Sequence, residues 1–204
     1  MRSLILVSLL TALLTFACGS IPETHYYTIG RPVPEAGTRL LEDTGLIIGV
    51  PQFEAEGIYA RDNLLYRKGN YEIAADYYRR WGIPPQKMLA EATIECLRAS
   101  GVFAEVVRLP SMSSVDLILV GRILRFEEVP DQVGSSARVD LEFCLKRPGD
   151  HSVLWRSEFS ENTTVGAIPT PEAVVVALES SIHSCLKQAA GKVAEMASKL
   201  SSGK

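Results

Sequence analysis

The segment ARVDLEFCLK, residues 137–146, decides the fold of this chain because its apolar and polar side chains alternate strictly. Successive side chains of an extended backbone point to opposite faces, so one face of this segment is apolar and the other is mostly charged. The apolar face consists of Ala137, Val139, Leu141, Phe143 and Leu145. This alternation is typical of an antiparallel strand with one buried face and one solvated face.

Two further extended segments flank this strand. Residues 116–127 are apolar on both faces at first and then alternate, and residues 153–164 place Val153, Trp155 and Phe159 on one face. The turns between the segments, residues 130–136 and 148–152, are short. We therefore predict a long antiparallel meander of three strands in the C-terminal half of the chain.

Five shorter strands are expected upstream of the meander. The apolar run 46–50 ends at Pro51 and suits a central strand that is buried on both faces. Residues 64–67 and 71–75 flank Lys68-Gly69-Asn70 and read as a hairpin, while residues 53–63 read as irregular and residues 76–82 are polar and aromatic. Residues 26–29 and 103–109 are rich in β-branched or aromatic side chains and predict two more strands.

Two helices complete the prediction. Residues 85–100 place apolar side chains at helical spacing and are followed by Gly101 as a C-cap. Thr170, Pro171 and Glu172 are typical of a helix start, and an apolar stripe continues from there to about residue 199. We predict a single α/β domain with α+β character: a mixed sheet, a C-terminal meander and two main helices.

The N-terminus has the features of an export signal. Arg2 precedes an apolar run over residues 4–16, which is too short to span a bilayer and is typical of a secretory signal peptide. Ala17-Cys18-Gly19 resembles the lipobox of bacterial lipoproteins, which implies cleavage before Cys18 and acylation of that cysteine. The predicted layout is a signal peptide over 1–17, a lipidated N-terminus and tether over 18–25, and one domain over 26–204. The alternative is an ordinary secreted protein that is cut near Ala17.

Composition narrows the classes of partner. The chain carries a formal net charge of −3 and has no run of Lys or Arg, so nothing in the sequence suggests nucleic acid or anionic lipid headgroups as a ligand. The apolar fraction of 47% and the charged fraction of 22% are those of a globular protein. No second apolar run approaches the length of a membrane span, so we expect any membrane contact to go through the acyl chains on Cys18.

The sequence offers no constellation of catalytic or metal-binding residues. The three histidines are far apart, and neither a zinc motif, a nucleophile elbow nor a phosphate loop is present. We therefore expect no enzyme activity, metal or cofactor. We expect Cys96, Cys144 and Cys185 to be small buried side chains. The alternative, in an oxidising compartment, is a Cys96–Cys185 disulfide. The adjacent tyrosine pairs, at residues 26–27 and 77–78, are either binding aromatics or strand residues packed in a core or against an edge.

A series of short stretches, taken in order, resembles the ABC-type transport auxiliary lipoproteins, the PqiC-like family. The stretches are Cys18-Gly19, residues 26–29, 47–51, 59–61 leading into 64–67, 80–85, and 116–119. The resemblance implies an outer-membrane lipoprotein that faces the periplasm, with a fold similar to the N-terminal domain of TolB. It further implies partnership with an MCE-domain protein and an ABC permease and ATPase that move lipids between membranes. Relatives can form rings, and Gly19 rather than Asp after the cysteine favours export to the outer membrane.

The leading hypothesis is a non-enzymatic accessory component that docks this transport machinery at the outer membrane. The alternatives are a monomeric lipoprotein that carries lipid in its own cavity and a periplasmic hydrolase, for which we find no suitable residues. Tyr59, Arg61 and Trp81 are the candidate partner contacts, because loops that carry aromatic residues and arginine are typical of interfaces. The competing interpretation is that these loops pack on their own domain.

Overall fold

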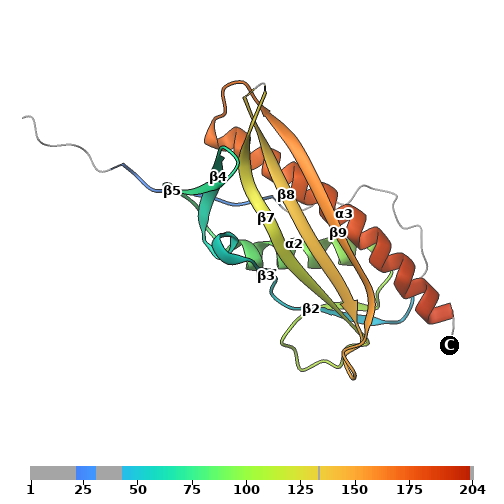
Figure 1. Ribbon diagram of the computed structural model, residues 1–204. Helices are drawn as coiled ribbons and strands as arrows, with labels where there is room; N and C mark the ends of the chain where they lie inside the picture. Colours follow the sequence, from blue (N-terminus) through green and yellow to red (C-terminus); the bar gives the residue numbers. More distant parts are fainter. Residues whose placement is uncertain (1–21, 31–42, 133, 203–204) are drawn as a thin grey trace, which may run out of the picture.

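The structure is a computed structural model that describes residues 22–30, 43–132 and 134–202 (Figure 1). The predicted signal peptide over 1–17 and Cys18 lie outside the described residues. Within the described part, the chain forms one mixed sheet of nine strands with two α-helices packed against it. The predicted fold class, a single domain with a mixed sheet and two main helices, is confirmed.

The predicted meander forms the largest part of the sheet. It consists of β7 (Leu117–Asp131), β8 (Gly134–Lys146) and β9 (Val153–Gly166), and each pairs antiparallel with the next. Along β8, the side chains of Ala137, Val139, Leu141, Phe143 and Leu145 are all fully buried, as the alternation predicts. The same register leaves the alternate residues of β9 exposed in a row: Arg156, Glu158, Ser160, Asn162 and Thr164.

Strand β7 is the spine of the sheet because three short strands pair with its second edge, all of them in parallel. These strands are β2 (Ile47–Val50), β3 (Glu54–Ala55) and β4 (Asn63–Lys68). Beyond β2 lies the parallel strand β6 (Glu105–Arg108). Beyond β4 come β5 (Glu72–Trp81), which is antiparallel to it, and then β1 (His25–Tyr27), which is parallel to β5. The β1–β5 edge therefore lies on one side of β7 and β9 lies on the other (Figure 1).

The two helices share one face of the sheet and pack against each other. Helix α2 (Pro85–Ser100) ends at Gly101, whose φ of 65° is the left-handed C-cap that glycine favours. Helix α3 (Pro171–Ser202) runs behind β8 and β9 (Figure 1), and the Oγ1 of Thr170 accepts a hydrogen bond of 3.2 Å from the backbone N–H of Ala173. The core between helices and sheet is a continuous apolar cluster that includes Ile48, Leu89, Leu97, Phe143 and Ile182, all fully buried. Among the helices described, none is long and apolar enough to cross a membrane.

One prediction about the strands is wrong. The second strand of the hairpin is predicted to end at residue 75, yet β5 continues to Trp81. The strand continues because its end pairs with β1, an edge strand of only three residues that sequence alone does not place there. The candidate site lies at this C-terminal end of β5.

Candidate functional site

A wide bulge in β5 determines the shape of the site. Leu65 on β4 pairs with Ala75 on β5, but the next paired residue on the β4 side, Asn63, lies opposite Arg80. Between these two paired positions β4 has one residue, Leu64, and β5 has four, residues 76–79. The carboxylate of Asp76 accepts hydrogen bonds from the backbone N–H groups inside the bulge, those of Tyr78 at 2.9 Å and Arg79 at 3.1 Å. Bulges of this kind re-aim side chains out of the regular pleat.

The bulge exposes two adjacent tyrosines. The side chain of Tyr77 is 78% exposed and that of Tyr78 is 42% exposed. Tyr26 on β1 is 68% exposed, and Tyr71 at the tip of the β4–β5 hairpin is 98% exposed. Tyr26, Tyr77 and Tyr78 therefore do not pack in the core, whereas Tyr26 and the partly buried Tyr27 do lie on an edge strand, β1. We call the exposed tyrosines and the hollow beside them the tyrosine face.

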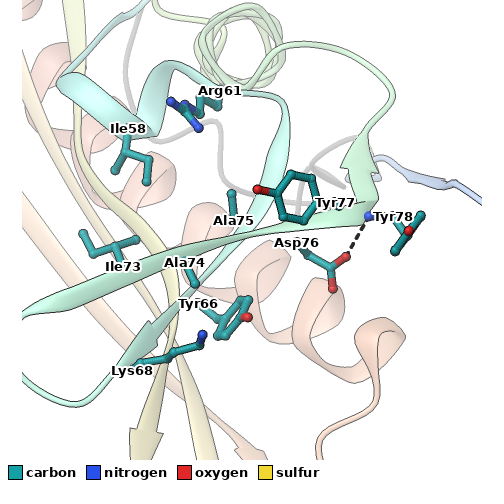
Figure 2. A pocket seen from close by; sticks show the side chains of 10 residues that line it. All are labelled: Ile58, Arg61, Tyr66, Lys68, Ile73, Ala74, Ala75, Asp76, Tyr77 and Tyr78. Carbon is teal, nitrogen blue, oxygen red and sulfur yellow. Dashed lines mark hydrogen bonds between the residues drawn. The ribbon is translucent and has the colours of Figure 1, made fainter.

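The hollow beside the bulge has a volume of about 470 Å³ and opens to the surface (Figure 2). Ile58 and Arg61 border it from the short helix η1 (Gly57–Ala60) and the residue after it, and Tyr77 borders it from the hairpin. Tyr66 and Lys68 on β4 line it as well. Phenol rings, alkyl groups, two cations and the carboxylate of Asp76 thus surround one open concavity. Asp76 is paired with Arg79 at 3.3 Å, and Lys68 forms an exposed ion pair with Glu72 at 3.5 Å.

Of the three candidate contact residues, only Arg61 is exposed. Tyr59 is 8% exposed and Trp81 is 3% exposed, and the Trp81 ring stacks on Phe126 with ring centroids 5.1 Å apart. Most arginines in the described part of the chain form ion pairs with carboxylates, for example Arg80 with Asp62 at 3.3 Å. No described carboxylate forms such a pair with Arg61, so its guanidinium is available to a ligand.

Tyr59 instead belongs to a buried polar cluster beneath the site. The carboxylate of Glu127 on β7 is fully buried and accepts hydrogen bonds from Nε of Arg67, at 2.9 Å, and from its Nη2. Burial, followed by the negative charge of Glu127, raises the pKa of Tyr59 to about 12. Arg67 also donates to the backbone carbonyl of Asn70 at 3.3 Å. The cluster thus fixes η1, β4 and the hairpin turn to the central strand of the sheet.

The N-terminal strand is fastened next to the bulge. The backbone N–H of Gly82 donates to the carbonyl of Tyr27 at 2.7 Å, and the Tyr27 hydroxyl donates to Oε1 of Glu172 at 3.1 Å. The backbone N–H of Gly30 donates to Oε1 of Glu179 at 2.6 Å. Backbone N–H bonding at the start of α3, together with the Tyr27 hydroxyl, lowers the pKa of Glu172. Strand β1 is therefore held between β5 and the first turns of α3.

The three cysteines in the described part of the chain form no bridge. Cys96, Cys144 and Cys185 are free thiols, so the Cys96–Cys185 disulfide that the sequence left open is absent from the described residues. Burial raises the pKa of Cys96 to about 11 and that of Cys185 to about 12, which keeps both thiols protonated. Among the described side chains, no group of three or more His, Cys, Asp or Glu residues is arranged to hold a metal ion.

Solved structures share this fold. The protein XCC0632 from Xanthomonas campestris, of the DUF330 family, superposes with a TM-score of 0.76 at 19% identity, over 88% of this chain and 99% of that one. A crystal structure of an uncharacterized protein superposes with a TM-score of 0.66 at 14% identity, over 84% of this chain and 99% of that one. The hypothetical protein CT253 from Chlamydia trachomatis superposes with a TM-score of 0.52 at 7% identity, over 77% of this chain and 98% of that one. No curated protein matches the sequence significantly.

The family follows from the sequence itself. The profile of the ABC-type transport auxiliary lipoprotein component matches residues 27–190, which is most of the chain. The chain therefore belongs to the family of ABC-type transport auxiliary lipoproteins, as its ordered short stretches predict. Membership makes it a membrane-anchored periplasmic component associated with an ABC-type transport system.

Proposed function

We propose that this protein is a non-enzymatic accessory lipoprotein that docks an ABC/MCE-type lipid transport system at the periplasmic face of the outer membrane. The observation that carries the proposal is the family match over residues 27–190. The proposed partners are an MCE-domain protein and the ABC permease and ATPase that act with it. In this proposal residues 1–17 are removed, Cys18 carries the lipid, and Gly19 directs the protein to the outer membrane.

The proposed contacts are not equivalent. We keep Arg61 as a direct contact because it is exposed and lacks an ion-pair partner among the described residues. Tyr59 and Trp81 act from beneath the surface by holding η1 and the end of β5 in place. For the transport machinery, the outer face of β9 is a suitable surface, because its exposed polar row lies on the side of the sheet opposite to β1.

The test of docking is co-purification with the transport proteins. An affinity-tagged, lipidated protein, extracted in mild detergent, should retain an MCE-domain protein and an ABC ATPase. Ser160→Trp, which places a bulky ring on the exposed row of β9, should reduce their recovery. Ser180→Trp on the exposed side of α3 is the matched control and should leave recovery unchanged. Co-purification of neither protein with the wild type would overturn the proposal.

The lipid anchor is tested separately. Cys18→Ser should move the protein from the membrane fraction to the soluble periplasmic fraction while its circular dichroism spectrum stays the same. Cys96→Ala is the matched control and should stay with the membrane. Membrane fractionation of Cys18→Ser that equals the wild type would rule out anchoring through this residue.

The alternative, a lipoprotein that carries lipid inside its own domain, receives no support from the two hollows found. Both are at the surface beside the β4–β5 hairpin, and charged side chains contribute to both linings. Native mass spectrometry of the purified Cys18→Ser protein decides this point, because a carrier would retain bound lipid.

A further inference from the structure

We propose that the tyrosine face rests on the phospholipid surface of the membrane that carries the anchor. The tyrosines meet the bilayer at headgroup level, and Arg61 and Lys68 bind lipid phosphates in the hollow between them. The inference rests on the lipid anchoring included in the proposed function, and it assigns Arg61 to the bilayer as its partner.

The length of the tether is the first argument. The seven residues from Gly19 to His25, where β1 begins, reach at most about 25 Å from Cys18 when fully extended. The end of the tether is fixed because β1 pairs with β5 and is bonded to Glu172. The part of the domain that lies nearest to the anchor is therefore the β1–β5 edge, where the chain enters the fold (Figure 1).

The second argument is the chemistry of that edge. Tyrosine is enriched at membrane–water interfaces because its ring is apolar and its hydroxyl stays hydrated. The four exposed tyrosines of the chain are Tyr26, Tyr71, Tyr77 and Tyr78, and all lie on β1, on β5 or at the hairpin tip. A guanidinium binds phosphate with a geometry that matches its planar fork. Arg61 forms no ion pair with a described carboxylate, so no such pair has to break before it binds a phosphate.

The opposite side of the sheet supports the assignment by contrast. The exposed row on β9 contains charged residues, serine, threonine and asparagine, and no aromatic residue. This composition suits a surface that remains in water. The domain thus has one edge suited to lipid headgroups next to the tether and one suited to the aqueous periplasm on the far side of β7.

The hollow also gives the contact a defined shape. Tyr66, Tyr77 and Ile73 provide walls of ring and alkyl carbon, while Arg61 and Lys68 provide positive charge (Figure 2). A phosphate with its attached glycerol has the matching pattern of an anion next to apolar groups. The bulge at Tyr77 and Tyr78 is what opens this surface, since a regular strand would point one of the two rings to each face of the hairpin.

The experiment uses the full lipidated protein on vesicles of phosphatidylethanolamine and phosphatidylglycerol that contain a lipid with a nitroxide on its headgroup. Tyr77→Cys and Asn162→Cys, each in a Cys96→Ala background, carry a fluorophore on the tyrosine face and on β9, respectively. The label at position 77 should be quenched several-fold more strongly than the label at position 162. Arg61→Gln should weaken the quenching at position 77, whereas Lys192→Gln on α3 should not.

The outcomes separate this inference from the proposed function. Flotation of the protein with the vesicles reports the anchor, and quenching reports the contact of the tyrosine face. Protein that floats but shows equal quenching at positions 77 and 162 overturns the inference and leaves the anchored docking role intact. Quenching at position 77 that requires an added MCE-domain protein, or that rises with protein density on the vesicles, also overturns it, because the occupant is then a protein or a second copy.

Discussion

Replacing Arg67 by methionine should destabilise the domain far more than the loss of a surface ion pair. The partner carboxylate of Glu127 is fully buried, and its Oε1 receives two hydrogen bonds from the guanidinium. Its other oxygen, Oε2, has no hydrogen-bond partner among the described residues. Arg67→Met keeps most of the alkyl stem but leaves a buried negative charge uncompensated.

The expected cost follows from this burial. Breaking a buried pair by removing one partner costs about 3–5 kcal/mol, because the remaining charge stays in a medium of low polarity. For a domain of this size, 1 kcal/mol shifts the melting temperature by roughly 2–4 °C, so we expect a decrease of about 10 °C. The assay is urea and thermal unfolding of the mature Cys18→Ser protein, followed by circular dichroism.

Two further variants make the experiment specific. In Arg67→Met/Glu127→Leu the buried charge is gone, so the double variant should recover most of the lost stability, since apolar replacement of a buried ion pair is often neutral. Lys192→Ala removes an exposed ion pair with Glu195 and should cost less than about 1 kcal/mol. The reasoning fails if Arg67→Met is as mild as Lys192→Ala, or if the double variant is no more stable than the single one.

Four other predictions follow from the core and the caps. Gly121→Ala places a methyl group on the ring of Phe53 and should cost about 1–3 kcal/mol in urea unfolding, with recovery in Gly121→Ala/Phe53→Leu; an additive double variant would contradict the clash. The buried Cys185 thiol, whose pKa is raised to about 12, should react with iodoacetamide only after unfolding, and rapid labelling of the native protein would refute this. Because the pKa of Tyr59 rises from 10.0 to about 12 on folding, the free energy of unfolding should fall as pH rises through this range. Tyr59→Phe should lose less stability over the same pH range, and equal pH profiles of the two proteins would refute the shift. Thr170→Ala should cost about 1 kcal/mol by removing the N-cap of α3, and an unchanged unfolding midpoint would contradict the capping role.

The sequence predicted those elements whose signal is local. The alternation over 137–146 fixes which side chains of β8 are buried, and Thr170 and Gly101 mark helix ends through bonds and dihedral angles formed nearby. The order of the strands is a different matter. One edge of β7 pairs in parallel with β2, β3 and β4. These pairings depend on contacts between residues far apart in the chain, and no local pattern encodes them.

The candidate site shows the same division. Tyr59 was expected at a surface because it lies in an irregular segment, but η1 turns it toward Glu127, which comes from a strand more than sixty residues away. Trp81 was expected in a loop, and its pairing with Tyr27 places it in a strand whose inner side meets Phe126. One signal for the site was present: Tyr77 and Tyr78 are adjacent, so in any strand they could not both point into the same core.

The burial of Tyr59 and Trp81 strengthens the case for a prearranged surface around Arg61. A contact surface costs less to bind when its shape is fixed beforehand, because fewer side chains and loops must be ordered on binding. Here η1 and the end of β5 are held from beneath by Tyr59 and Trp81, and β1 is bonded to the start of α3. Helix α3 then runs for 32 residues, or about 48 Å, along the back of β8 and β9. If Cys18 carries the lipid as proposed, the β1–β5 edge lies nearest to the membrane, and the outer face of β9 then points toward the periplasm and the proposed transport partner.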